Sequence, residues 1–208
     1  MDIYQYFQPT EENKDEIVAS YKILNYIQAT DKYILYFGLR QSDNKQVLIK
    51  SVQKSIITDD NSQLQFQREV DALFYLQSPY VIEFLDFFSD DQHYFLIFEK
   101  LPTLHDYIMN HRKLKEIEAS SIFTELLQAI KMCHTKGIAL RSLALDNIYI
   151  THKKKKDIYT KNIGIKISGF EFCSYLSNQS PEIDESEITC FTAPEQFSKA
   201  IPRIDNKS

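Results

Sequence analysis

The sequence of 208 residues has no tryptophan, 4 glycines and 3 cysteines, and it contains no long apolar run. No apolar segment could span a bilayer as a helix, so we expect no membrane partner. The cysteines are odd in number and lack the C-x-x-C or C-x-x-H spacing that chelates zinc; they are Cys133, Cys173 and Cys190. We expect reduced thiols in an intracellular protein, and no metal site.

The charge balance excludes further classes. With 24 Lys and Arg against 29 Asp and Glu, the net charge is −5. A general nucleic-acid binder needs cations that neutralise phosphates, so we expect no nucleic-acid partner. The first residues are acidic and polar, unlike a secretory signal or an arginine-rich transit peptide. The proportions of 43% apolar and 25% charged residues are those of an ordinary globular protein.

The first half of the chain alternates between apolar runs and turn-forming residues. Runs rich in Ile, Val, Leu and Tyr predict five antiparallel strands, at residues 23–27, 32–39, 47–52, 81–88 and 93–99. Between the third and fourth strands, the capping residues 59–61 precede a helical repeat. Its apolar members are Phe66, Val70, Leu73 and Phe74.

The second half is mainly helical in pattern. A short helix is predicted near residues 104–110, followed by a longer one that ends at Gly137. We expect the longer helix to carry one apolar face, made of Ile122, Phe123, Leu126, Leu127, Ile130 and Cys133. A hairpin of residues 148–150 and 163–167 follows. Strands with one helix, then helices, predict the α+β class.

Residues 140–147 read Leu-Arg-Ser-Leu-Ala-Leu-Asp-Asn. This stretch resembles the catalytic loop of protein kinases, H-R-D-L-K-x-x-N. Three positions keep the family residue, namely Arg141, Leu143 and Asn147. Three do not, because Leu140 replaces the His, Ser142 the catalytic Asp and Ala144 the Lys.

Other kinase-like motifs follow the family's order across roughly residues 21–197. Residues 47–50 look like the V-A-I-K strand, and Glu69 stands where a helical Glu would pair with Lys50. Gly169 takes the place of the D-F-G Asp, and residues 193–195 are a complete A-P-E. The sequence around residues 126–137 is most similar to that of calmodulin-dependent and related Ser/Thr kinases.

The resemblance implies a bilobal α+β fold with three parts. We expect an extension at 1–20, and a small lobe at 21–101 with a five-stranded antiparallel sheet and one helix. A mainly helical large lobe follows at 102–208. Because kinase large lobes continue well past A-P-E, this lobe is expected to be truncated, and a protein partner is expected to cover its missing half.

The replaced motif residues predict lost chemistry. The positions of the glycine-rich loop hold Gln28, Thr30 and Tyr33, which favours a plain hairpin over a phosphate cradle. Ser142 cannot act as the general base near neutral pH, and Gly169 cannot bind magnesium. We therefore expect a pseudokinase that is not an enzyme, with no catalytic residue, cofactor or metal.

The nucleotide positions are expected to be vestigial. Three positions that line the adenine in the family hold bulky side chains here, and these would exclude the adenine ring. They are Leu48, Phe98 and Tyr149. Lys50 and Glu69 are expected to persist as a structural ion pair. Together with Asn147 they are the only nucleotide-site positions kept.

The expected function is that of a scaffold or structural subunit of a larger assembly. The alternatives are a nucleotide-binding regulatory switch and a weak Ser/Thr kinase. A basic run could dock on an acidic protein surface or be a solvated loop; it consists of Lys153, Lys154, Lys155 and Lys156. This run and a ciliate-like composition rich in Lys, Ile, Gln and Tyr favour the cytoplasm, more specifically a cilium or the cytoskeleton.

Overall fold

A computed structural model of the chain describes residues 17–141, 143–152 and 163–175. The chain divides into two compact units. The first unit comprises Met1–Gln63 and Glu83–Lys100, and the second comprises Leu64–Ile82 and Leu101–Ser208. Helix α1 (Asp60–Tyr75) belongs mostly to the second unit. The lobe boundaries expected from the sequence stay a prediction.

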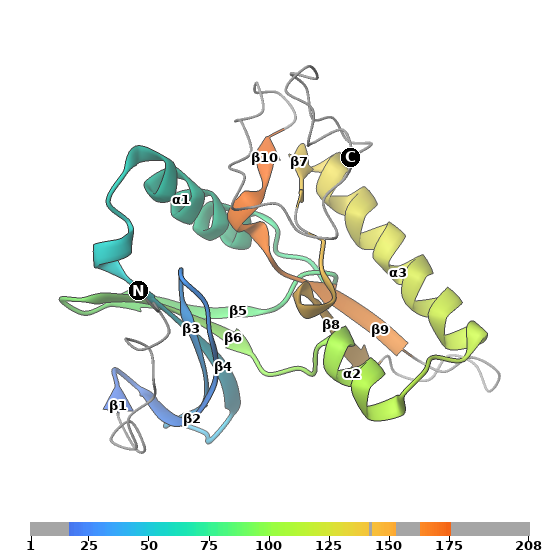
Figure 1. The fold of residues 1–208 in the computed structure, drawn as a ribbon, viewed down its shortest axis with the longest axis horizontal. Helices are drawn as coiled ribbons and strands as arrows, with labels where there is room; N and C mark the ends of the chain where they lie inside the picture. Colours follow the sequence, from blue (N-terminus) through green and yellow to red (C-terminus); the bar gives the residue numbers. More distant parts are fainter. Residues whose placement is uncertain (1–16, 142, 153–162, 176–208) are drawn as a thin grey trace, which may run out of the picture. The chain divides into compact units, whose positions relative to one another are not determined.

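The first unit is an antiparallel sheet, drawn from blue to green in Figure 1. Its strands are β1 (Ile17–Val18), β2 (Tyr21–Ala29), β3 (Ile34–Arg40), β4 (Gln46–Gln53), β5 (Phe84–Ser89) and β6 (His93–Glu99). The order across the sheet is β1-β2-β3-β4-β6-β5. The five predicted strands are confirmed, and the two-residue β1 extends the edge beside β2.

Strand β4 is buried on both faces, which explains the apolar run of residues 47–49 within it. Val47 and Ile49 belong to a core cluster with side chains from β2, β3 and β6. Since side chains alternate along a strand, Leu48 and Lys50 point to the opposite face. The sheet therefore has a core on one face and the kinase-like lysine on the other.

The sheet curls until strands near its two edges meet. The Tyr21 hydroxyl on β2 donates to Oδ2 of Asp86 on β5, at 3.0 Å. The Tyr21 ring also stacks on Phe88, with centroids 5.8 Å apart and planes 7° apart. Burial and the neighbouring carboxylate raise the pKa of Tyr21 to about 12, because both disfavour the phenolate.

The Tyr21→Phe variant should therefore lose stability in a pH-dependent way. Loss of the hydrogen bond is expected to lower the free energy of unfolding by ~1 kcal/mol near neutral pH. A raised pKa in the folded state contributes stability below pH 10 that is lost as the pH rises toward 12. Urea unfolding across this range should show the wild-type advantage shrinking. An advantage that stays constant to pH 12 would contradict this role of Tyr21.

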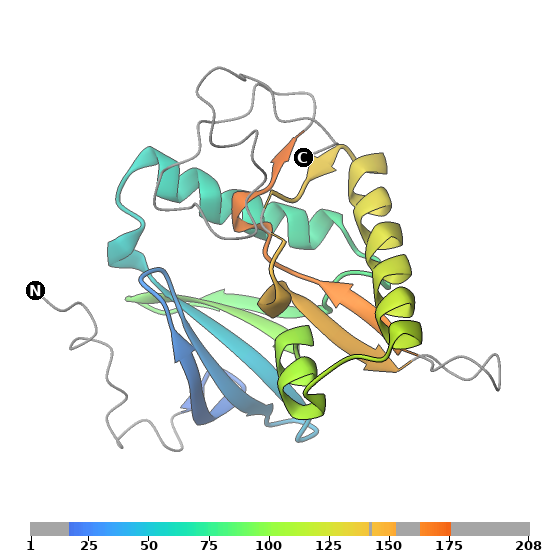
Figure 2. The same ribbon diagram turned by 45° about the vertical axis from the view of Figure 1, so that its right-hand side comes forward.

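The second unit combines helices with two-stranded pairings. Its remaining named elements are α2 (Leu104–His111), α3 (Glu116–Thr135), β7 (Ile138–Ala139), β8 (Ile148–His152), β9 (Ile163–Ile167) and β10 (Ser174–Tyr175). Helix α3 packs on β9, and α2 packs on β8 (Figure 2). A capping box of Thr103 and Asp106 begins α2. No helix in the described part of the chain is long and apolar enough to cross a membrane.

The α+β kinase-like fold is confirmed, but the predicted apolar face of α3 is partly wrong. Ile122, Leu126 and Cys133 are buried, together with Ala129. Phe123 and Leu127 are 59% and 50% exposed. Each follows a buried residue by one position, so it lies about 100° further round the helix. The long apolar run therefore covers two faces of α3, of which one is buried.

Candidate functional site

In the first unit, the kinase-like lysine lies against an aromatic ring. Lys50 is 7% exposed on β4, and its Nζ lies 4.3 Å from the ring centroid of Tyr33. Tyr33 comes directly before β3, at a position where the family pattern has a glycine. An ammonium over an aromatic face is attracted by the ring quadrupole, more strongly when water is excluded. Tyr33 thus offers Lys50 an electrostatic partner from within the chain.

The sheet face that carries Lys50 is otherwise filled by large apolar side chains. Leu48 pairs with Phe98 across β4 and β6, and both are buried. The Phe98 ring lies 5.5 Å from the Phe84 ring of β5. The two positions expected to fill the adenine side in this unit are therefore packed together.

In the second unit, the loop that resembles the catalytic loop has an unusual backbone. Arg141 has a φ of +63°, a conformation that non-glycine residues rarely adopt. A short 3-10 turn, Leu145–Asn147, leads into β8. The backbone carbonyl of Asn147 accepts a hydrogen bond from Ser168 N at 2.9 Å. This bond holds the loop beside the segment that stands for D-F-G.

Gly169 has a left-handed backbone and no room for a side chain. Its φ and ψ are +82° and 44°. A Cβ built on it would lie 2.4 Å from Nδ2 of Asn147 and 2.6 Å from its Cγ. Asn147 thus occupies the space that a side chain at position 169 would need, and the family's metal-binding Asp would not fit without movement of Asn147.

The other predicted site positions of the second unit are buried. Glu69 on α1 is 6% exposed, and Tyr149 on β8 is 7% exposed. Leu140, which replaces the family His, and Phe170 are 6% and 0% exposed. In the same stretch, residues 148–150 are buried, whereas Leu143 and Leu145 are half-buried.

The described thiols have the character of core residues. Cys133 and Cys173 are free and buried, and burial raises the pKa of each to about 12. At neutral pH neither supplies the thiolate that a nucleophile or a metal site requires. Within the described ranges, no group of three His, Cys, Asp or Glu side chains could hold a metal ion.

Several predicted positions lie outside the described residues. They are Ser142, Lys153, Lys154, Lys155, Lys156, Cys190 and the A-P-E of residues 193–195. Sequence reasoning also missed one contact, because Tyr33 was interpreted only as a lost glycine. The sequence signal that could have revealed this contact was an aromatic residue directly before β3, the strand that pairs with the strand of Lys50.

Comparisons with known proteins agree with the fold. The family described as "Protein kinase domain" matches residues 34–203. "NUAK family SNF1-like kinase 2" of Rattus norvegicus is 30% identical over 69% of this chain and 24% of the relative. "NUAK family SNF1-like kinase 1" of Homo sapiens is 30% identical over 66% of this chain and 22% of the relative.

A third relative matches a larger share of the chain than these two. "Probable serine/threonine-protein kinase fhkA" of Dictyostelium discoideum is 29% identical over 83% of this chain and 29% of the relative. The chain therefore spans between a fifth and a third of the length of these relatives.

The prediction that the chain is not an enzyme is contradicted by these comparisons. The relatives are named as kinases, one of them as a serine/threonine-protein kinase, and the similarity covers most of the chain. The prediction treated each replaced motif residue, above all Ser142 and Gly169, as lost chemistry. The names of these relatives point to enzyme activity, so phosphoryl transfer is a property to be measured.

Proposed function

This chain belongs to the protein kinase family, and we propose that it serves as a scaffold subunit of a larger protein assembly. In this role the folded domain acts mainly through the protein surfaces it binds. The proposal accounts for a chain that keeps the fold of the family while its nucleotide-facing positions hold large side chains.

The position of Lys50 is the observation that carries this proposal. In the family, this lysine contacts nucleotide phosphates. Here its ammonium lies 4.3 Å from the Tyr33 ring, in a buried setting. A phosphate would have to displace that contact, at a cost of ~2 kcal/mol for a desolvated cation and ring. Because Lys50 has the Tyr33 ring as a partner, the domain does not need a nucleotide to stabilise this lysine.

Two further features support binding to proteins. The packed pair of Leu48 and Phe98 leaves little volume beside Lys50 for a planar base. The basic run of residues 153–156 would suit an acidic protein surface. We place the assembly in the cytoplasm and, more specifically, at a cilium or the cytoskeleton, on the strength of composition and this basic run.

The proposal is tested by the mass of the native particle. The full chain, carrying an affinity tag and expressed in its own cells, should be recovered with a stoichiometric protein partner. Its mass should exceed the 24.5 kDa of the chain alone. Recovery as a monomer would contradict the assembly role. A variant with Lys153→Ser and Lys154→Ser tests the basic run, with Lys100→Ser and Lys113→Ser as the charge-matched control.

Phosphoryl transfer or nucleotide-dependent switching is the second candidate function. It is favoured by the names of the relatives and by the presence of Lys50, Glu69 and Asn147 at the family positions. Labelled ATP should then transfer phosphate to a generic Ser/Thr substrate in a reaction that Lys50→Met abolishes. Transfer that is unchanged in Lys50→Met would come from a contaminant and would count against this candidate.

A further inference from the structure

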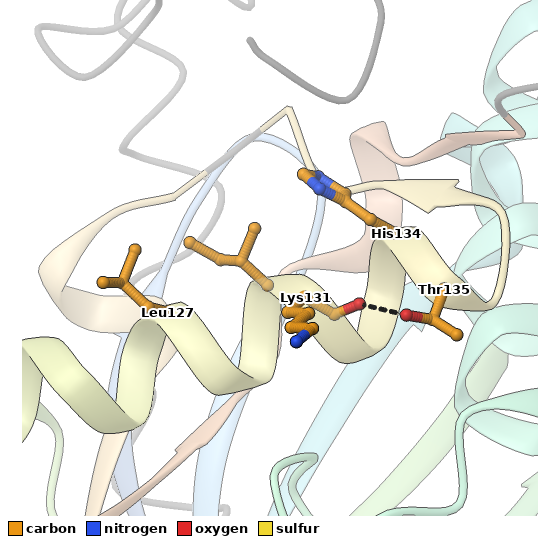
Figure 3. A pocket seen from close by; sticks show the side chains of 5 residues that line it. Leu127, Lys131, His134 and Thr135 are labelled. Atoms are coloured by element: carbon orange, nitrogen blue, oxygen red, sulfur yellow. Dashed lines mark hydrogen bonds between the residues drawn. The ribbon is translucent and has the colours of Figure 1, made fainter.

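A hollow of about 480 Å³ in the second unit lies along α3 but does not enclose a ligand. Its lining comes from this one helix, namely from Leu127, Ile130, Lys131, His134 and Thr135 (Figure 3). The Thr135 hydroxyl donates to the Lys131 carbonyl at 2.8 Å, so this hydroxyl is engaged within the helix. Binding sites enclose a volume and gather polar groups from several elements, so this hollow is not a candidate site.

A smaller hollow in the first unit is lined by several elements. Its volume is about 30 Å³. The turn between β2 and β3 lines one side, and β4 and β6, which pair with each other, line another. The polar members of the lining are Asp31, Lys32, Tyr33, Ser51, Gln53 and His93.

Ser51 is the buried polar residue of this lining. It is 6% exposed, and it lies two residues after Ile49, so both side chains lie on the core face of β4. Within the described residues the Ser51 hydroxyl has no hydrogen-bond partner. A buried hydroxyl without a partner destabilises a protein, because it has given up its hydrogen bonds to bulk water. The Ser51 hydroxyl therefore indicates a ligand that forms hydrogen bonds.

Gln53 and His93 supply further polar groups to the same hollow. They lie directly opposite each other across β4 and β6. The side-chain amide of Gln53 makes no hydrogen bond to another described residue. Nδ1 of His93 lies 3.6 Å from Oδ1 of Asp90, which leaves Nε2 for the hollow. A hydroxyl, an amide and a ring nitrogen match the two to four hydrogen bonds that a buried water makes.

The charge and the size of the hollow favour a small neutral ligand. Asp31 and Lys32 bring opposite charges to its lining, so neither a cation nor an anion is favoured by the net charge. The volume of about 30 Å³ exceeds the ~10–15 Å³ that one water requires, and it is too small for a nucleotide. Water is the neutral ligand of this size that both donates and accepts hydrogen bonds.

We infer that one ordered water molecule binds in this hollow and forms hydrogen bonds with Ser51, Gln53 and His93. The water joins β4 to β6 beside the turn that carries Tyr33, whose ring contacts Lys50. It is therefore a positioning element of the first unit. The inference goes beyond the assembly role, because a water inside this unit does not depend on a partner chain.

Ser51→Ala tests the inference through the sign of its effect on stability. If the water is bound, alanine removes one of its partners, and the folding equilibrium constant should fall about fivefold. If no water is bound, alanine removes an unsatisfied hydroxyl, and the constant should stay the same or rise. Urea unfolding of the full chain, followed by circular dichroism, measures this constant. An unchanged or larger constant would overturn the inference.

Ser174→Ala is the matched control. Ser174 is 3% exposed on β10, and its Oγ has no hydrogen-bond partner among the described residues. It also lies in a strand, but it does not line the hollow. Its replacement should leave the folding constant unchanged or raise it. Equal falls in the two variants would overturn the inference, because they would reflect the loss of any buried strand serine.

Gln53→Leu tests whether Ser51 and Gln53 share the water. Its effect on the folding constant should be smaller in the Ser51→Ala background than in the wild type, because the first substitution already weakens the water site. Strictly additive effects of the two substitutions would contradict a shared water.

Nuclear magnetic resonance detects the water directly in the full chain. Nuclear Overhauser cross-peaks between water and the amide protons of Ser51 and Gln53 should carry the sign of a long-lived internal water. Ser51→Val should remove these cross-peaks, because its methyl groups occupy the hollow. Cross-peaks in the wild type with the sign of short-lived surface water, or cross-peaks that persist in Ser51→Val, would overturn the inference.

Discussion

Replacing Phe170 by alanine is expected to lower the free energy of unfolding by ~3–5 kcal/mol. Phe170 has 0% exposure and is among the largest fully buried side chains of the described residues. It begins the 3-10 turn after Gly169, in the segment that stands for D-F-G. Removing its ring loses apolar burial and leaves a cavity, because the surrounding side chains relax only in part. Thermal unfolding should shift down by roughly 10 °C.

Phe123→Ala is the control for this prediction, because it removes the same ring from an exposed position. Phe123 is 59% exposed on α3, so its loss should change the free energy of unfolding by less than about 0.5 kcal/mol in the isolated chain. Urea unfolding followed by far-UV circular dichroism measures both variants. Equal effects of the two substitutions would show that the Phe170 ring is not a core residue in solution.

Replacing Gly169 by alanine is expected to destabilise the second unit by ~2–4 kcal/mol. Part of this cost is the left-handed backbone, at a φ of +82°. The other part is steric, because the side chain of Asn147 must shift to make room for the new Cβ. The same collision predicts that Gly169→Asp, which restores the family's metal-binding residue, destabilises the chain as well.

Gly137 supplies a close control for the backbone contribution. Its φ is +75°, but a Cβ built there meets no atom within 4 Å. Gly137→Ala should therefore be milder than Gly169→Ala by ~1–3 kcal/mol, the cost of overpacking. Asn147→Gly should restore much of the stability of Gly169→Ala, since it removes the colliding side chain. Urea unfolding of these single and double variants provides the comparison, and equal losses at the two glycines would contradict the steric account.

Much of the fold could be predicted from local patterns. Strands β4 and β6 stand out by the apolar runs of residues 47–49 and 94–98, because both of their faces are buried. The helix α1 was predicted from its capping residues and from Val70 and Leu73, which are buried. These patterns depend only on residues that are close in the sequence, so they can be recognised without knowledge of tertiary contacts.

The failures arose where tertiary packing decides. Phe74 on α1 and Phe123 on α3 were assigned to apolar faces, yet they are 55% and 59% exposed. Hydrophobicity alone cannot show which of two adjacent stripes on a helix finds a partner. The closing of the sheet through Tyr21 and Asp86 was also not predictable, because 65 residues separate them in the sequence.

The site was predictable as a set of positions but not as a set of contacts. The resemblance assigned Lys50, Glu69, Asn147 and Gly169 to motif positions of the kinase family, and these assignments stay predictions. It could not show that the Tyr33 ring lies against Lys50, or that Asn147 fills the space above Gly169. It also led to the wrong prediction that the chain is not an enzyme, because each replaced motif residue was considered separately.

The most direct test of this account is a calorimetric titration of the full chain with ATP and magnesium. If Tyr33, Leu48 and Phe98 fill the nucleotide-facing side of the first unit, the wild type should show no saturable heat up to about 1 mM ATP. The double variant Tyr33→Ala and Leu48→Ala should gain binding, whereas Tyr94→Ala, which removes the ring over Lys54, should not. Saturable micromolar binding by the wild type would contradict the account and favour the nucleotide-dependent function.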